Sequence, residues 1–118
     1  MKIAIVGVCA SGKTTLVAGL KAAGYDAYNV AQEHSCIHAF WNKHHPDLLV
    51  MLDATMSAVH KRRTVSWDEN RLIAQHGRLA DARSHADLYI QTDELDAAAV
   101  RARVIQLIKD WEAKQGMV

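Results

Sequence analysis

The chain has little proline, little cysteine and almost no net charge. Its 118 residues include one proline and two cysteines, and the formal net charge is +1 with histidine neutral. Such a charge creates no field that would attract nucleic acid or an anionic membrane surface, so we expect neither as a partner. No apolar run approaches the ~20 residues of a membrane span. A chain of this length predicts a single domain over residues 1–118.

The two cysteines indicate a reducing compartment. Cys9 and Cys36 have neither the spacing of a redox motif nor that of a structural zinc site. Thiols used in this way are typical of the cytoplasm, where we expect the protein. The apolar N-terminal run is interrupted by Gly12 and Lys13, so we expect no cleaved signal peptide.

One motif carries most of the functional information. Residues 7–14 read GVCASGKT and fit the Walker A pattern G-x-x-x-x-G-K-[ST] at every required position. Lys13, expected to be exposed at a loop, would place a positive charge near the β- and γ-phosphates of a nucleotide, and the Thr14 hydroxyl can ligate Mg²⁺. The residues expected to bind the nucleotide are Gly7, Ala10, Ser11, Gly12, Lys13, Thr14 and Thr15.

The segments around this motif predict an α/β fold. Residues 2–6 form an apolar run typical of a buried parallel strand, and apolar residues recur at helical spacing over 16–23 before Gly24, a typical helix stop. Further strands are predicted over 27–31, 48–52 and 88–90. The alternation with helices predicts a parallel sheet of about four strands with helices on both faces, of the P-loop NTPase type. Ligands of such sheets sit beyond the carboxyl ends of the strands.

Three of the predicted helices have a defined apolar face. A helix over 35–45 would place Ile37, Phe40, Trp41 and His44 on one side. A long helix from the capping-box pattern of Ser66 and Glu69 would bury Leu72, Ile73, Leu79 and Ala80. The last helix would bury Val100, Val104, Leu107, Ile108 and Trp111. A further helical stretch is predicted over 57–63.

Two carboxylates are candidates for magnesium or acid–base chemistry. Glu33 follows the second strand and would face the γ-phosphate if that strand lies beside the first. The alternative is a carboxylate at the start of a helix. Asp53 ends an apolar run in the manner of a Walker B acid, which binds Mg²⁺, usually through water. A helix N-cap is the alternative, and the one that we favour for Asp53.

Basic side chains are candidates for stabilising a transferred phosphoryl group. Arg62 and Arg63 end a short basic run, and Arg78 and Arg83 lie on the next predicted helix. A solvated helix face is the alternative for each of them. The sequence also places the zinc-ligand types His34, Cys36 and His38 close together, but their spacing is not a usual zinc pattern.

With these residues in view, the chain resembles the P-loop kinases of small molecules, the group that contains adenylate, thymidylate, shikimate and deoxynucleoside kinases. GVCASGKTTL is similar to their phosphate loop, and Glu33-His34-Ser35 is similar to the Glu-Arg-Ser segment of deoxynucleoside kinases, with His34 in place of arginine. Residues 46–63 resemble their later strand and arginine-bearing lid helix, and residues 86–100 their last strand and its helix. The resemblance implies ATP or GTP, Mg²⁺ and a metal or base role for Glu33 rather than Asp53.

The chain departs from that family at the acceptor side. A substantial acceptor-binding segment follows the first helix in those kinases, whereas only residues 24–29 lie there in this chain. We therefore keep two hypotheses: a compact phosphotransferase with a small-molecule acceptor near His34, His38 and Trp41, or a nucleotide-binding switch or slow NTPase that acts through a protein partner. A histidine-rich metal-binding protein is a third hypothesis. Because a short chain leaves the site open to water, we expect a homodimer or a complex that covers it with the face around Trp41.

Overall fold

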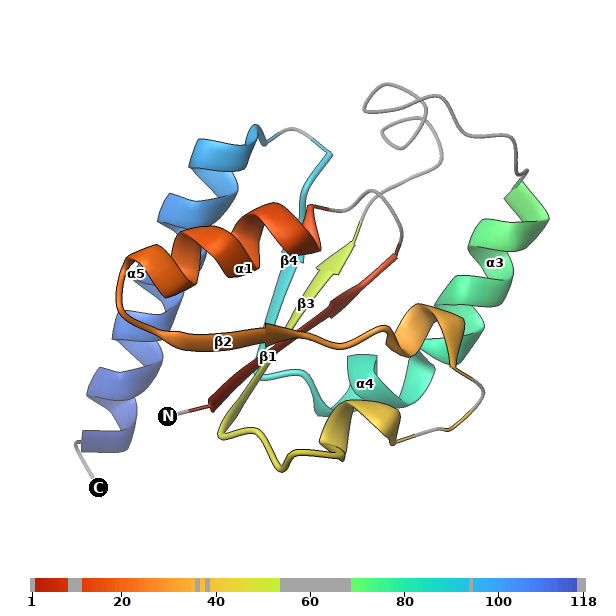
Figure 1. Cartoon of the computed structure of the whole chain (residues 1–118), viewed down its shortest axis with the longest axis horizontal. Coiled ribbons are helices and arrows are strands. Elements are labelled where there is room, and N and C mark those ends of the chain that lie inside the picture. Colours follow the sequence, from red (N-terminus) through yellow and green to blue (C-terminus); the bar gives the residue numbers. More distant parts are fainter. Residues whose placement is uncertain are drawn as a thin grey trace.

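A four-stranded parallel sheet forms the centre of the molecule (Figure 1). The computed structural model describes residues 2–8, 12–35, 37, 39–53, 69–93 and 95–116. The strands are β1 (Lys2–Gly7), β2 (Asp26–Asn29), β3 (Leu48–Asp53) and β4 (Leu88–Gln91). They lie in the order β2-β1-β3-β4, and every neighbouring pair is parallel. The predicted parallel α/β sheet is therefore confirmed.

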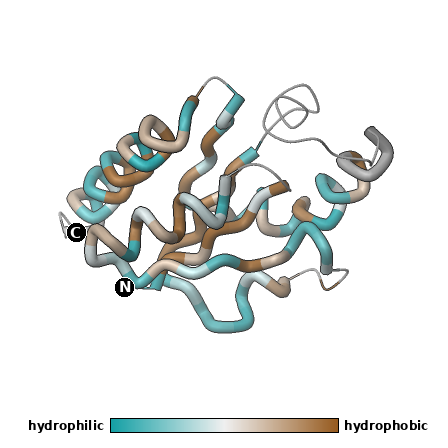
Figure 2. The backbone as a smooth tube through the Cα atoms, turned by 45° about the horizontal axis from the view of Figure 1, so that its top comes forward, coloured by the Kyte–Doolittle hydropathy of each residue, from teal (hydrophilic) through white to brown (hydrophobic). Residues whose placement is uncertain are grey.

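Helices cover both faces of this sheet, as the sequence predicts. On one face lie α1 (Lys13–Ala22) and α5 (Ala97–Gly116). On the other lie α3 (Glu69–Arg78), α4 (Ala80–His85) and the short 3-10 helices η1 (Gln32–His34) and η2 (Phe40–Asn42). Hydrophobic residues concentrate along the strands between the two layers (Figure 2). The central strands β1 and β3 therefore contribute alternate side chains to two separate cores.

The first helix ends where the sequence predicts. Gly24 has a φ of 95°, a left-handed conformation that glycine adopts without steric cost. The Tyr25 N–H donates to the Leu20 carbonyl at 2.9 Å and the Gly24 N–H to the Lys21 carbonyl at 3.0 Å. These two bonds form a Schellman motif, which satisfies the last carbonyls of α1 and turns the chain into β2.

The helix predicted over 35–45 is wrong. Only η2 forms there among the described residues, and Ile37, predicted on an apolar helix face, is 64% exposed. Local side chains occupy the backbone groups that a helix needs: the Ser35 hydroxyl accepts from the Ile37 N–H at 3.1 Å. The buried Gln32 amide binds the Ile37 carbonyl and the Trp41 N–H. Side chains that bind the backbone in this way compete with helix formation.

The long helix predicted after Glu69 is two helices. The chain leaves α3 at Arg78 and enters α4 at Ala80, with the fully buried Leu79 between them. The predicted apolar face is wrong at Ile73, which is 59% exposed, and at Ala80, which is also exposed.

The apolar face predicted for the last helix is confirmed. Val100, Val104 and Ile108 are buried, and Leu107 and Trp111 pack against the same core. None of the described helices is both long and apolar enough to cross a membrane.

Candidate functional site

The two ends of the Walker A motif lie where the first strand stops and the first helix starts. Gly7 is the last residue of β1, and Lys13 is the first residue of α1. Gly12 precedes the helix with a φ of 97°, so it uses the conformational freedom that the motif reserves for glycine. Among the described residues, no side chain caps the N-terminus of α1. The predicted phosphate ligands Ala10 and Ser11 lie outside the described residues.

The ammonium of Lys13 is buried, which corrects the expectation of an exposed loop lysine. Lys13 is only 9% exposed, and its Nζ donates to the carbonyl oxygen of Gly7 at 2.7 Å. The same nitrogen forms an ion pair with Glu33 Oε2. Burial is tolerated because the carboxylate neutralises the ammonium and both groups are hydrogen-bonded.

Glu33 reaches this lysine because β2 lies directly beside β1. The register pairs Ile5 with Asn29, so the chain leaves β2 close to the end of β1. Glu33 follows on η1 and is 3% exposed. Its second carboxylate oxygen, Oε1, is buried and has no hydrogen-bond partner among the described residues. An acceptor left in this state costs about 1–3 kcal/mol, so this oxygen favours any donor or cation that can reach it.

The Thr14 side chain lies on the exposed side of the same helix start. Asn29, the last residue of β2, donates from Nδ2 to the Thr14 hydroxyl at 3.4 Å. Lys13 and Thr14 therefore bring an ammonium and a hydroxyl to the first turn of α1, and η1 adds a carboxylate. The sequence did not single out Asn29, since an isolated asparagine at a strand end carries no recognisable motif.

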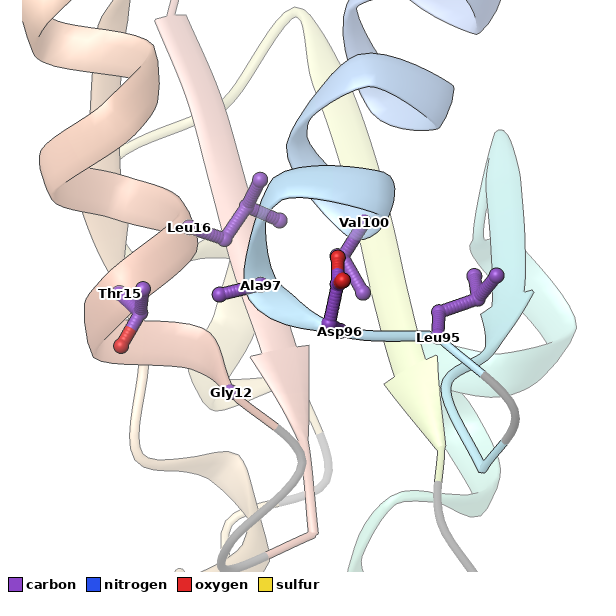
Figure 3. A pocket seen from close by; sticks show the side chains of 7 residues that line it. All are labelled: Gly12, Thr15, Leu16, Leu95, Asp96, Ala97 and Val100. Atoms are coloured by element: carbon purple, nitrogen blue, oxygen red, sulfur yellow. The ribbon is translucent and has the colours of Figure 1, made fainter.

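A largely apolar pocket of about 310 Å³ adjoins the helix start. It lies between the first turn of α1 and the first turn of α5, as Figure 3 shows. Asp96 caps α5 by accepting the Ala99 N–H at 2.8 Å, which holds that wall of the pocket. The lining residues are Gly12, Thr15, Leu16, Leu95, Asp96, Ala97 and Val100.

Asp53 faces the layer of α3 and α4. Its carboxylate accepts from His76 Nε2 at 2.9 Å, Arg83 Nη2 at 3.0 Å and the Tyr89 hydroxyl at 2.5 Å. Partial desolvation of the phenol, reinforced by the hydrogen bond to Asp53, raises the pKa of Tyr89 to about 12. Asp53 is thus the centre of a polar cluster rather than a partner of Lys13. The favoured N-cap interpretation concerns residues that follow it, which lie outside the described part of the chain.

Gln32 and Arg78 hold η1 in place within the layer opposite α1. The Gln32 amide is fully buried and donates to the Ile37 carbonyl at 2.8 Å and the Arg78 carbonyl at 3.2 Å. Its oxygen accepts the Trp41 N–H at 2.8 Å. Arg78 Nη1 donates to the Glu33 carbonyl at 3.2 Å. Arg78, a candidate for stabilising a transferred phosphoryl group, thus contacts the backbone of the segment that carries Glu33.

Arg62 and Arg63, and the helix predicted over 57–63, lie outside the described residues. Their proposed contact with a transferred phosphoryl group stays a prediction.

The predicted cluster of histidine and cysteine is described only in part. His34 is half-exposed beside Glu33, with Nε2 at 3.9 Å from Oε2. Cys36 and His38 lie outside the described residues. Within the described ranges no group of three histidine, cysteine or acidic side chains could hold a metal ion.

No protein-family model matches the chain, and no curated protein is significantly similar to it in sequence. The resemblance to P-loop kinases therefore depends on the residues themselves. Of these, the phosphate loop is the most specific.

Proposed function

We propose that the chain binds a nucleoside triphosphate, ATP or GTP, with Mg²⁺ and transfers the γ-phosphoryl group to a small molecule. The observation that supports this most is the ammonium of Lys13, held at the first residue of α1 by Gly7 and Glu33. In the described part of the chain, no side chain caps this helix start. Its N–H groups and dipole favour an anion, and the lysine adds a full charge to them.

Phosphate binding adds a third acceptor to Lys13. Two acceptors share its ammonium in the structure, the Gly7 carbonyl and the Glu33 carboxylate. An ammonium has three hydrogens, so one donor remains for an arriving phosphate oxygen. The phosphate then shares the positive charge with Glu33, and repulsion between the two anions offsets part of the binding free energy.

The oxygen atoms around this pair fit a magnesium ion. Glu33 Oε1 is buried without a described partner, and Thr14 supplies a hydroxyl one residue after Lys13. Mg²⁺ prefers oxygen ligands and usually takes only one or two from side chains. Thr14 and Glu33 would hold the ion, which supplies charge neutralisation at the phosphates. Asp53 is the weaker alternative, because three donors already engage its carboxylate.

The apolar pocket beside Thr15 suits the nucleoside. It adjoins Gly12, so a base between α1 and α5 would leave its phosphates at the helix start. Apolar walls such as Leu95 and Val100 bind adenine and guanine alike, because they contact ring faces rather than edges. We therefore propose ATP or GTP without a preference.

The residues proposed to act on the transferred group follow from their chemistry. Glu33 is the proposed base for an attacking hydroxyl, because its carboxylate lies beside the ammonium that would bind the phosphates. Arg62 and Arg63 remain the proposed cations for the developing charge.

A second function is favoured by the short connection between α1 and β2. Only residues 23–25 join the end of α1 to the start of β2. The kinases that the chain resembles carry their acceptor-binding segment there. The alternative is therefore a nucleotide-binding switch or slow NTPase that acts through a protein partner.

We also propose a cytoplasmic location, on the basis of the two thiols of Cys9 and Cys36. Neither nucleic acid nor a membrane is proposed as a partner, because the formal net charge is only +1.

Calorimetric titration of Mg·ATP and Mg·GTP tests the nucleotide site. We expect Lys13→Gln to weaken binding by at least about tenfold, because the charge-assisted bonds to phosphate are lost. Lys21→Gln, in the last turn of the same helix, is the matched control and should bind like the parent. Circular dichroism checks that both variants are folded. Equal affinity in Lys13→Gln and the parent would exclude Lys13 from the site.

A turnover screen separates the two functions. Mg·ATP is incubated with pooled small hydroxyl compounds, and phosphorylated products are resolved from free phosphate. Phosphorylated products support the phosphotransferase, whereas slow release of phosphate alone supports the alternative. In either case we expect Glu33→Gln to reduce turnover more than nucleotide affinity, because it removes the charge but preserves the shape. Equal turnover would reduce Glu33 to a structural partner of Lys13.

A further inference from the structure

A second pocket, of about 660 Å³, lies at the carboxyl ends of β3 and β4. Its residues come from α3, α4 and the two strands, so they belong to the layer opposite α1 and α5. The pocket is therefore separate from the one beside Thr15. Its polar floor consists of Asp53, His76, Arg83 and Gln91, and Ile73 and Ala80 form an apolar wall.

Asp53 orients the other polar side chains of this floor but does not itself bind the ligand. Asp53 is 6% exposed, and its carboxylate accepts from three side chains around it. Its charge is balanced by the Arg83 guanidinium at 3.0 Å. A ligand amine would have to displace these donors, so the floor does not favour a cation.

The groups that Asp53 orients still have hydrogen-bonding capacity. His76 Nε2 must carry the hydrogen because it faces a carboxylate, which leaves Nδ1 as an acceptor on the neutral ring. That imidazole is 35% exposed. Arg83 is 47% exposed and directs only Nη2 to Asp53, so further guanidinium N–H groups remain for an anion. Its guanidinium also lies 5.6 Å from the centre of the Tyr89 ring, which limits its rotation.

We propose that this pocket binds a small hydroxy acid, with the acid group on Arg83 and the hydroxyl donating to Nδ1 of His76. A fixed cationic donor next to a neutral acceptor matches an anion that carries a hydroxyl within the same small molecule. Ile73, which is 59% exposed, would cover the carbon skeleton. The Gln91 side chain adds an amide at the edge of the floor.

The pocket opens at the same edge of the sheet as the phosphate loop. Leu52, the residue before Asp53, is paired with Gly7 in the β1–β3 register. A hydroxy acid bound here would therefore be available as the phosphoryl acceptor. That use rests on the proposed function, whereas the binding itself does not.

The test is a titration of D-glycerate in the absence of nucleotide, followed by NMR of the His76 ring nitrogens, the Arg83 Nε–H and the Gln91 side-chain amide. Acetate and glycerol are the comparison probes, because each carries only one of the two required groups. We expect D-glycerate to bind more tightly than either. Chemical-shift changes centred on the first turn of α1, or no saturation in the tens of millimolar, would overturn the inference.

Two matched pairs of variants assign the contacts. Arg83→Gln should weaken D-glycerate binding by about tenfold or more, whereas Arg103→Gln on the exposed side of α5 should not change it. His76→Gln should reduce the preference for D-glycerate over acetate by about threefold to tenfold, and His85→Gln should preserve it. Equal effects within a pair would contradict the assignment. A Mg·ATP titration on the same sample tests the nucleotide site independently of the hydroxy-acid pocket, because either ligand can bind when the other does not.

Discussion

At the scale of single residues, the buried pair of Lys13 and Glu33 is the most consequential feature. Both charges are buried, and their mutual attraction offsets the free-energy cost of desolvation only while both are present. The pair is therefore a sensitive point of the fold as well as the centre of the proposed site. Its stability can be measured without any ligand.

We expect Lys13→Met to lower the free energy of unfolding by about 3–5 kcal/mol, because it leaves the Glu33 carboxylate buried without its counter-ion. Urea unfolding at neutral pH measures this. Lys21→Met, an exposed position of the same helix, should change the free energy by less than about 0.5 kcal/mol. The double variant Lys13→Met with Glu33→Met should recover most of the loss. A single variant as stable as the control would mean that the pair contributes nothing to the fold.

Tyr89 gives the stability a dependence on alkaline pH. Its pKa is raised from 10.0 to about 12, mainly by partial desolvation and then by the hydrogen bond to Asp53. Because the folded state holds this proton more tightly, the stabilisation is complete below about pH 10 and is lost as the pH rises through about 12. We expect the gap in free energy of unfolding between the parent and Tyr89→Phe to shrink from about pH 8 to about pH 11. A gap that widens over this range would contradict the sign of the shift.

At the scale of the secondary-structure elements, the hydrogen bonds of Gln32 connect three segments of the chain. One amide contacts the carbonyls of Ile37 and Arg78 and the N–H of Trp41, so η1, η2 and α3 share a single buried side chain. The same contacts decide where Glu33 lies, because it is the next residue on η1. The element that carries the candidate acid is therefore positioned from the layer opposite α1.

Gln32→Leu should lower the free energy of unfolding by about 3 kcal/mol, because it leaves backbone groups of three segments without partners. Trp41 fluorescence should change as well, since its backbone bond is lost. Gln106→Leu, on the exposed side of α5, is the control and should be nearly neutral. If both variants unfold at the same urea concentration, other groups replace the Gln32 contacts.

The sequence predicted the elements whose signal is local and missed those decided by distant contacts. Apolar runs sufficed for the four strands, and the Walker A spacing sufficed for the helix start at Lys13. The helix predicted over 35–45 does not form, because the Gln32 side chain hydrogen-bonds backbone groups that the helix would need. The cluster around Asp53 was not predicted as a unit, because its partners on α3, α4 and β4 are 23 to 36 residues away in sequence. Only the strand order brings them together.

At the scale of the whole molecule, the strand order brings β2 and β3 to the two sides of β1. The carboxyl ends of all three strands therefore lie at one edge of the sheet, with Glu33 on one side of the end of β1 and Asp53 on the other. The two pockets flank this edge from opposite layers. An assembly that covers the edge would shield both from water.

We expect a homodimer or a complex that covers the site with the face around Trp41. Trp41 is itself anchored, since its indole N–H donates to Asp81 at 2.8 Å, but Ile37, which shares the Gln32 amide with it, is 64% exposed. Light scattering at micromolar concentration, with and without Mg·ATP, measures the mass. Ile37→Ser should favour the monomer, because burial of its apolar surface would be lost. A monomer in both conditions that phosphorylates a small acceptor would contradict the expectation.

The position of α5 has a consequence for the order in which the chain folds. β1, β2 and β3 are complete by Asp53, but the face that Val100, Val104 and Ile108 cover stays open until α5 has left the ribosome. A nascent chain that stops between these points exposes the apolar side of its central strands. The time taken to synthesise residues 54–116 therefore sets how long this apolar side remains uncovered.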